Sequence, residues 1–259
     1  MPKATSKKGA SATLTNGTQN TEDSDSSEEA TQSRSQMTLT QAEKALGSMS
    51  GVEVEQLVND LVIYLMIADQ KKIPIKRQDI NKNVLKDNKR AFAGLMSKAK
   101  AKLETVFGIK LIDLEQSRYI LVNTLDNPVA EDVDVEDHAK TGLVLVILAL
   151  IFMRGNQIGE DELFEALRKL GVDVDQPHEV FGDVRRLITV EFIRQAYLES
   201  ERQPTIDPPK LIFHWGLRAK AETTKRDVLE FVCSIYGNKE PTEWRAQWLD
   251  IVESERSQS

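Results

Sequence analysis

The sequence is poor in the residues that stabilise secreted proteins or bind metal ions. Its 259 residues include a single cysteine, Cys233, so no intrachain disulfide can form and a reducing compartment is favoured. Cys233 lies in an apolar helical pattern typical of a buried structural thiol. The histidines His138, His178 and His214 are far apart and have no cysteine or carboxylate at metal-ligand spacing. We therefore predict no metal site and no cofactor.

Long apolar runs and glycine-rich phosphate loops are also missing. The most apolar stretch, Leu143–Met153, is shorter than the roughly 20 residues that a membrane-spanning helix needs. The N-terminus is polar and lacks the apolar segment of a signal peptide. No glycine pattern matches a nucleotide-binding loop. These absences predict a protein without enzymatic activity, without a small-molecule substrate and without membrane contact.

The stretch 142–170 contains the strongest helical signals of the chain. Its first half, Leu143–Met153, has no polar side chain, which predicts a helix that is buried on all sides. After a polar turn, three acids precede an amphipathic helical pattern, as the helix dipole favours. The apolar positions of this second pattern are Leu163, Phe164, Leu167 and Leu170.

Three segments have the composition of tails or linkers. Residues 1–48 are rich in serine, threonine and glutamine, carry an acidic cluster at 22–29 and contain almost no bulky apolar side chain, which predicts a disordered tail. Residues 126–138 carry six acids and no lysine or arginine, which predicts an exposed acidic linker. Residues 238–259 are expected to form a C-terminal tail.

Between these segments the same order of elements occurs twice. In the first unit, residues 49–125, helical patterns precede a β-hairpin; they lie at 52–68, 77–85 and 89–107, with the hairpin at 109–122. In the second unit, residues 139–237, three helices are expected at 139–153, 160–170 and about 178–188, extended runs at 191–198 and 210–215, and a closing helix at 219–236. Three helices followed by a hairpin form a winged helix. We therefore predict a mainly helical α+β fold with tandem winged-helix domains.

The charge distribution indicates a nucleic-acid ligand. The net charge of −7 argues against a protein that is basic all over, yet residues 71–110 contain 12 basic and only 3 acidic residues. In the second unit, basic residues occupy the expected recognition-helix, first-strand and wing positions, where winged helices meet DNA. We predict duplex DNA binding through Arg185, Arg186, Arg194 and Lys210, with Lys76, Arg77, Lys82, Lys89 and Arg90 as the alternative face. Charge alone leaves a merely solvated helical face as the other interpretation.

Several of these stretches resemble the MAGE homology domain family. In the second unit, GLVLVILALIFMRGNQIGEDELFEAL, RRLITVEFIRQAYLESERQP and LIFHWGLRAKAETTKRDVLEFV match the family in order, spacing and most apolar positions. The first unit matches through IPIKRQDI, ETVFGIKLIDLE and YILVNT. The resemblance covers roughly residues 52–237 and implies tandem winged helices.

The resemblance also implies partners. MAGE proteins bind RING-type ubiquitin ligases, and the branch to which this chain is most similar provides subunits of the five/six structural-maintenance-of-chromosomes complex. Those subunits hold a RING subunit and a kleisin and touch DNA. The RING-docking position of the family corresponds to Leu65, Met66 and Ile67.

A groove for a kleisin helix is expected on the second unit. We place it at Phe164, Leu167 and Leu170, because their helical face lies beside the most apolar helix of the chain. The sequence thus predicts a nuclear, non-enzymatic subunit for chromosome maintenance and DNA repair. The alternative is a stand-alone MAGE adaptor that stimulates or redirects a RING ubiquitin ligase without binding DNA. A sequence-specific transcription factor would need base-reading side chains, and none can be identified.

Overall fold

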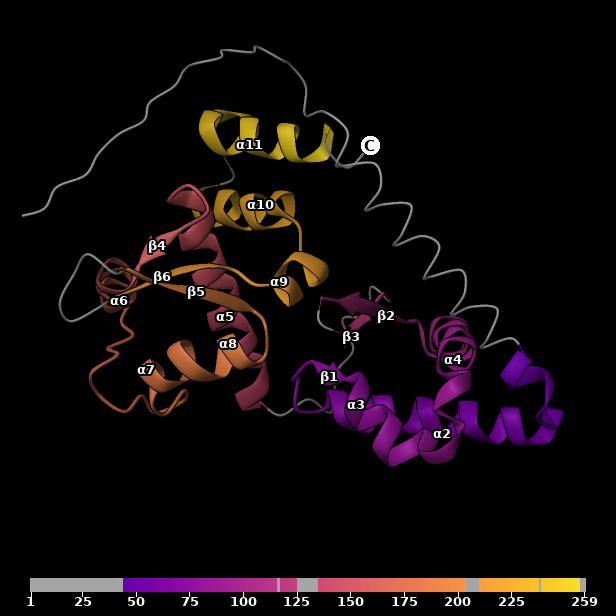
Figure 1. Ribbon diagram of the computed structural model, residues 1–259. Helices are drawn as coiled ribbons and strands as arrows, with labels where there is room; N and C mark the ends of the chain where they lie inside the picture. Colours follow the sequence, from indigo (N-terminus) through magenta and orange to yellow (C-terminus); the bar gives the residue numbers. More distant parts are fainter. Residues whose placement is uncertain (1–43, 116, 125–134, 204–209, 238, 257–259) are drawn as a thin grey trace, which may run out of the picture.

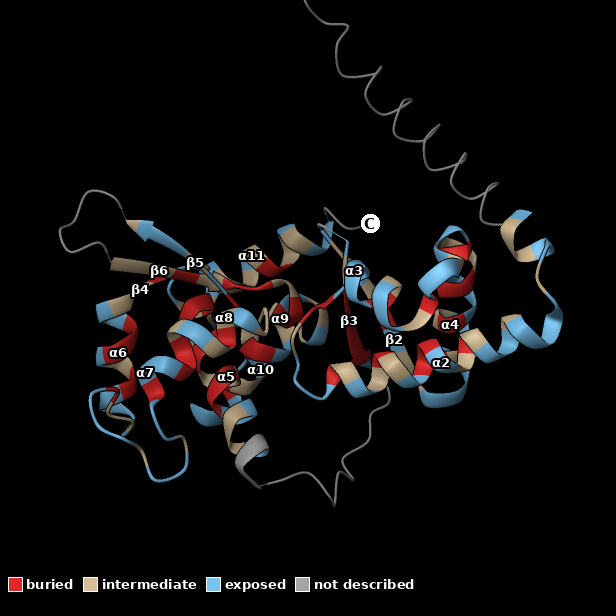
Figure 2. Ribbon diagram, turned by 60° about the horizontal axis from the view of Figure 1, so that its bottom comes forward, coloured by how far each residue is buried: buried red, intermediate tan, exposed pale blue. Residues whose placement is uncertain are grey.

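The computed structural model describes residues 44–115, 117–124, 135–203, 210–237 and 239–256. Two units follow one another along the chain and lie side by side, each with helices around a small antiparallel sheet (Figure 1). Each unit has its own core of buried apolar residues. Figure 2 shows these buried positions on the inward faces of the helices of both units. The predicted tandem winged-helix architecture is confirmed.

The first unit consists of helices packed around the sheet β1-β3-β2. Its elements are α2 (Gly51–Asp69), β1 (Ile75–Lys76), α3 (Arg77–Ile80), the π-helical turn η1 (Asn81–Leu85), the 3-10 turn η2 (Lys86–Ala91), α4 (Phe92–Phe107), β2 (Ile109–Leu114) and β3 (Arg118–Asn123). The helix α2 begins at Ser50, whose hydroxyl accepts the backbone N–H of Glu53. The helix α4 ends at Gly108, which adopts the left-handed conformation with φ 62°.

The second unit repeats this plan with the sheet β4-β6-β5 and adds helices at its C-terminal side. Its elements are α5 (Val135–Met153), β4 (Ile158–Gly159), α6 (Glu160–Lys169), α7 (Val184–Arg186), the π-helical turn η3 (Leu187–Glu191), α8 (Phe192–Arg194), β5 (Leu198–Gln203), β6 (Lys210–Trp215), α9 (Leu217–Glu222), α10 (Lys225–Ile235), η4 (Pro241–Glu243) and α11 (Arg245–Arg256).

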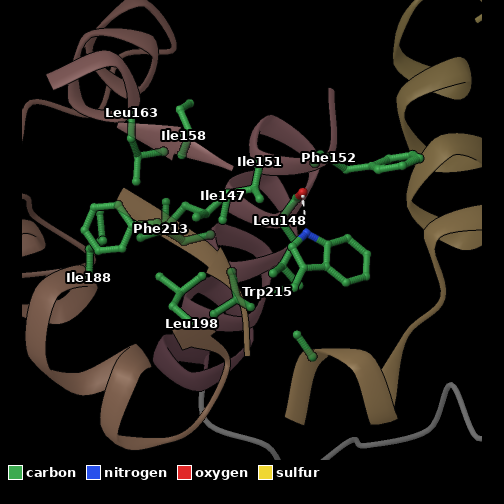
Figure 3. Packing of buried hydrophobic residues seen from close by; sticks show 14 of the residues in the cluster. Ile147, Leu148, Ile151, Phe152, Ile158, Leu163, Ile188, Leu198, Phe213 and Trp215 are labelled. Carbon is green, nitrogen blue, oxygen red and sulfur yellow. Dashed lines mark hydrogen bonds between the residues drawn. The ribbon is translucent and has the colours of Figure 1, made fainter. Parts of the chain in front are cut away.

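The helix α5 lies at the centre of the second core, as its apolar sequence predicts. Figure 3 shows Ile147 and Ile151 between the sheet and the neighbouring helices. The indole N–H of Trp215 donates a hydrogen bond to the carbonyl oxygen of Leu148 at 2.9 Å, which satisfies the one polar group that this side chain brings into the core (Figure 3). Among the described residues, no helix combines the length and the apolar character needed to cross a membrane.

The prediction of an extended run at 191–198 is wrong. The helical segment α7–η3–α8 continues to Arg194, and strand β5 begins only at Leu198. The sequence ITVEFI is rich in β-branched residues and favours a strand by propensity, but Ile188 and Phe192 are buried on one helical face against the second core. Arg194 therefore lies on a helix and not on the first strand of the wing.

The other boundaries differ less. The predicted closing helix is two helices, interrupted at Thr223 and Thr224, where Thr224 and Asp227 form the capping box that starts α10. Residues 44–47 are already helical, and Leu46 packs so close to Gly94 that any larger residue at position 94 would collide with it. Most of the expected C-terminal tail forms η4 and α11, which the buried Ile251 anchors to the second core. The rest of the N-terminal tail, most of the linker and the proline-rich loop of the second unit lie outside the described residues.

One buried arginine joins the two units. The guanidinium of Arg218, on α9, is fully buried and donates to the carbonyl oxygen of Leu121 on β3 at 3.2 Å and to Asp69 at the end of α2 at 3.3 Å. It also donates to Glu222 at 2.9 Å and to the carbonyl oxygen of Gln195 at 3.1 Å. A buried charge is tolerated when its donors are satisfied in this way, so this cluster fixes the placement of α9 against the first unit.

Candidate nucleic-acid and partner interfaces

The first unit carries a basic surface whose cations form no ion pairs in the described structure, although Asp79 and Asp87 lie in the same segment. Lys76 and Arg77 lie at the junction of β1 and α3, Lys82 lies in η1, and Lys89 and Arg90 lie in η2. All five side chains are exposed, and none forms an ion pair with a carboxylate of the described residues. The Arg77 guanidinium lies 4.2 Å from the centroid of the Phe92 ring, a cation–π contact that holds it in place. This surface therefore keeps its positive potential.

Two of the predicted DNA-binding residues of the second unit are compensated. Arg185 pairs with Asp175 at 2.7 Å and with Glu160 at 3.3 Å, and its guanidinium lies 4.6 Å from the Phe164 ring. The hydrogen bond from Arg185 holds the pKa of the Asp175 carboxyl below its usual value. Lys210 pairs with Asp161, the neighbour of Glu160. Arg185 and Lys210 are thus each paired with acids, and these acids reduce the local positive potential.

The other two predicted DNA-binding residues of the second unit, Arg186 and Arg194, lie apart from each other. Arg186 is exposed and approaches Glu191 at 3.8 Å, whereas Arg194 lies at the far end of the same helical segment. Arg194 is exposed and forms no ion pair within the described part of the chain. This helical segment has the position of a winged-helix recognition helix, but its charge is mixed.

The three residues at the expected RING-docking position do not share one surface. Leu65 is fully buried in the first core and Met66 is partly buried against it, whereas Ile67 is 59% exposed. Ile63, one turn before Ile67, is exposed as well. In this part of α2 the exposed apolar side chains are therefore Ile63 and Ile67, which form a stripe one turn long, and Leu65 packs in the core below it.

The residues at the expected kleisin position also include both buried and exposed side chains. Phe164 and Leu167 are buried in the second core, whereas Leu170, at the end of α6, is 61% exposed. A cavity of about 820 Å³ lies elsewhere on the second unit, between the turn after α5, the end of β6 and the helices α9, α10 and α11. Its lining includes His214, whose Nε2 is buried without a hydrogen-bond partner in the described structure. No pattern in the sequence indicates this cavity, because its walls come from five separate elements.

Within the described ranges, no group of three or more His, Cys, Asp or Glu side chains could hold a metal ion. Cys233, the one thiol of the chain, is buried in the second core. The features that stand out at the surface are therefore the basic surface of the first unit and the exposed apolar side chains of α2 and α6. All of these features suit binding to macromolecules.

Comparison with known proteins gives a single family. The model of the MAGE homology domain matches residues 61–226. The human "Non-structural maintenance of chromosomes element 3 homolog" is 44% identical over 224 residues, which cover 85% of this chain and 73% of that protein. The mouse protein of the same name is 41% identical over 219 residues, which cover 83% of this chain and 78% of that protein.

Two further relatives extend the comparison. Human Melanoma-associated antigen D2 is 44% identical over 200 residues, which cover 76% of this chain and 33% of that protein. A chain of the solved "Nse1-Nse3-Nse4 complex" is 42% identical and superposes with a TM-score of 0.74, over 78% of this chain and 99% of the solved one. The likeness thus includes both sequence and the arrangement of both units. The chain belongs to the MAGE homology domain family.

Proposed function

We propose that this protein is the MAGE subunit of the five/six structural-maintenance-of-chromosomes complex. In this role it would act in the nucleus, in chromosome maintenance and DNA repair, as a non-enzymatic scaffold. The observation that carries the proposal is the likeness to the Nse1-Nse3-Nse4 complex, whose matching chain is covered almost completely. The similarity to the human and mouse element 3 homologs supports the same assignment.

The RING-type ubiquitin ligase subunit would dock on α2. Ile63 and Ile67 form an exposed apolar stripe there, and the partly buried Met66 adjoins it. Exposed apolar side chains that lie one helical turn apart suit an interface that buries them. Leu65 would act indirectly, by holding α2 in its position on the core.

The kleisin would bind the second unit as a helix in a groove. Leu170 supplies an exposed apolar contact at the end of α6, and Phe164 and Leu167 support it from the core. The two partner surfaces would then lie on different units, so that both partners can bind at once.

Duplex DNA would bind without sequence preference through phosphate contacts. The uncompensated residues Lys76, Arg77, Lys82, Lys89 and Arg90 supply the stronger positive potential, so we place the principal DNA face on the first unit. Arg186 and Arg194 would add secondary contacts, whereas Arg185 and Lys210 are held by acids. No described side chain stands out as a reader of base edges.

Reconstitution tests the proposal. The full chain is mixed with the RING subunit and the kleisin of the same complex, and the products are resolved by size-exclusion chromatography with mass measurement. A ternary complex that retains duplex DNA supports the proposal. Binding of a RING ligase without the kleisin or DNA would instead favour a stand-alone ligase adaptor, the second candidate that membership of the MAGE homology domain family suggests.

A further inference from the structure

The edge of the first sheet places two cations directly opposite each other. Lys76 on β1 pairs in register with Arg118 on β3, in an antiparallel ladder. Side chains at such positions lie on the same face, with Cβ atoms about 5 Å apart, and like charges there repel each other. Neither residue forms an ion pair with a carboxylate in the described structure. Within the part of the chain that the structure describes, no ion pair offsets this repulsion.

Arg77 adds a third cation to the same place. It follows Lys76 in sequence, and its backbone N–H donates to the carbonyl oxygen of Ser117, the residue before Arg118, at 3.0 Å. Its guanidinium is positioned over Phe92, and the Nε–H of Arg118 donates to the carbonyl oxygen of Glu115 at 3.3 Å. Two of the three cationic side chains are thus partly ordered before any ligand arrives, which lowers the entropic cost of binding.

The acids near these cations are few and partly engaged. Asp113 lies opposite Tyr119 on the neighbouring strand pair and approaches Lys100 at 3.8 Å. Glu115 contributes its backbone carbonyl oxygen to Arg118. Asp79 and Glu115 are exposed, and within the described residues neither carboxylate pairs with Lys76, Arg77 or Arg118. The three cations at the base of the wing are therefore available to an external anion.

We infer that Lys76, Arg77 and Arg118 form a phosphate-binding cluster that takes a phosphodiester group of duplex DNA at the base of the first wing. This inference rests on the proposed DNA binding and assigns Arg118 a role in it. Arginine and lysine together suit a phosphate, because the guanidinium binds two oxygens and the ammonium adds a point charge. One anion between Lys76 and Arg118 would also convert their repulsion into attraction.

The second unit supplies an internal comparison, because it has the same topology without these charges. Strand β4 pairs with β6 as β1 pairs with β3, and Gly159 and Ile212 occupy the register positions of Lys76 and Arg118. The first residue of the following helix is Glu160 in place of Arg77. The fold therefore does not require cations at these positions.

The test uses the full chain and a fluorescein-labelled 30-base-pair duplex, with anisotropy measured over a series of salt concentrations. Arg118→Gln, Lys76→Gln, their double variant and the triple variant with Arg77→Gln are compared with a charge-matched triple control, Lys44→Gln/Lys98→Gln/Lys169→Gln. We expect Arg118→Gln to weaken binding about 5-fold and the triple variant to weaken it at least about 30-fold. For the triple variant, the slope of log affinity against log salt concentration should become shallower by about one, because one phosphate contact is lost. The control should change affinity by no more than about 3-fold.

The double variant adds a further criterion. If Lys76 and Arg118 share one phosphate, their combined loss is smaller than the product of the two single losses, because the first substitution already removes the shared contact. Lys76→Gln alone should also raise the melting temperature of the free protein slightly, because it removes the cross-strand repulsion. Melting curves of all the variants show in addition whether each one is folded.

Two results would overturn the inference in distinguishable ways. If Arg118→Gln and the triple variant bind as the control does, while changes at Lys89 and Arg90 remove binding, the cluster is not the site and DNA binding itself stands. If the unchanged protein does not bind the duplex even at 50 mM salt, the proposed DNA binding fails and the phosphate cluster fails with it.

Discussion

The two units share one topology but differ in charge at the same point of the fold. In the first unit, the junction between the short strand β1 and the helix after it reads Lys76-Arg77; in the second, the junction after β4 reads Gly159-Glu160. Glu160 accepts the backbone N–H of Leu211 at 3.2 Å and binds Arg185, and an acid is also favoured at the start of α6 by the helix dipole. The second unit thus uses this junction for internal contacts, whereas the cations of the first form no ion pairs there in the described structure.

The first helices of the two units differ as well. The helix α5 is covered by α10, which α11 and η4 cover in turn, so its apolar residues lie in the core (Figure 1). In its described residues the first unit has no counterpart of α10 and α11, and α2 exposes Ile63 and Ile67. The first helix of the second unit is therefore enclosed in its core, whereas that of the first unit packs one face on the core and exposes another. Duplication of a fold allows this division, because stability and binding no longer depend on the same face.

The largest expected effect concerns the contact that joins the units. Arg218→Ala removes a fully buried cation that pairs with Asp69 and Glu222 and donates to the carbonyl oxygens of Leu121 and Gln195, so we expect the free energy of unfolding to fall by about 3–5 kcal/mol. Urea denaturation followed by circular dichroism measures the change. Arg226→Ala is the control, since this residue forms a bidentate but exposed pair with Glu255 and should cost less than about 1 kcal/mol. Equal losses for the two variants would show that Arg218 does not hold the units together.

The apolar stripe of α2 can be separated from the core beneath it. Ile63→Ser/Ile67→Ser should weaken the complex with the RING subunit at least about 30-fold, with little loss of stability, because both side chains are exposed. Leu65→Ala should instead reduce the free energy of unfolding by about 2–5 kcal/mol, because it leaves a cavity in the first core. Calorimetric titration and denaturation measure the two effects, with Leu170→Ser as a control that should not alter RING binding. If the double variant binds normally, α2 is not the docking helix.

The charge difference between the units is tested by matched reversals. Lys89→Glu/Arg90→Glu and Arg186→Glu/Arg194→Glu each change the net charge by the same amount, and both leave the Arg185 bridge intact. We expect the first pair to weaken duplex binding about 10- to 30-fold and the second by about 3-fold or less, because Lys89 and Arg90 form no ion pairs in the described structure and belong to a larger basic surface, whereas Arg186 lies near Glu191. Anisotropy at 100 mM salt measures both. The reverse order of effects would place the DNA face on the second unit, around the recognition helix.

The sequence predicts the elements well where one periodicity dominates. The apolar run of α5, the amphipathic α6 and the hairpin of β2 and β3 give clear helical or alternating patterns, and the structure confirms all three. The stretch 191–198 fails because local β-propensity and tertiary burial disagree there, and burial decides. Within Leu65–Ile67, every residue is apolar, so the sequence cannot tell which one faces the core.

Charge pairing is the other property that the sequence hides. Arg185 meets Asp175 and Glu160 only because a loop and α6 approach α7 in the folded chain. The neighbourhood of Lys76 and Arg118 depends on strand register, since 41 positions separate them in the sequence. The basic residues along the chain therefore predict the basic surface of the first unit, but they do not indicate Arg118. They also do not show that Arg185 and Lys210 are paired with acids.

The smallest expected effect comes from the acidic cluster at 22–29, which is attached to the first unit through residues 44–47. Its five acids, Glu22, Asp23, Asp25, Glu28 and Glu29, repel DNA and compete for the cations of the first unit, so neutralising them with amides should tighten duplex binding about 2- to 3-fold at 50 mM salt. The advantage should vanish by 200 mM salt, because the Debye length falls from roughly 14 Å to 7 Å over this range. The same substitutions in a protein with Lys89→Glu/Arg90→Glu should have less effect, since fewer cations remain for which the acids can compete. Anisotropy titrations of the four proteins at both salt concentrations form the complete test. A gain in affinity that persists at 200 mM salt would indicate a specific contact between the cluster and the protein, and an equal gain in both backgrounds would indicate general repulsion unrelated to the first unit.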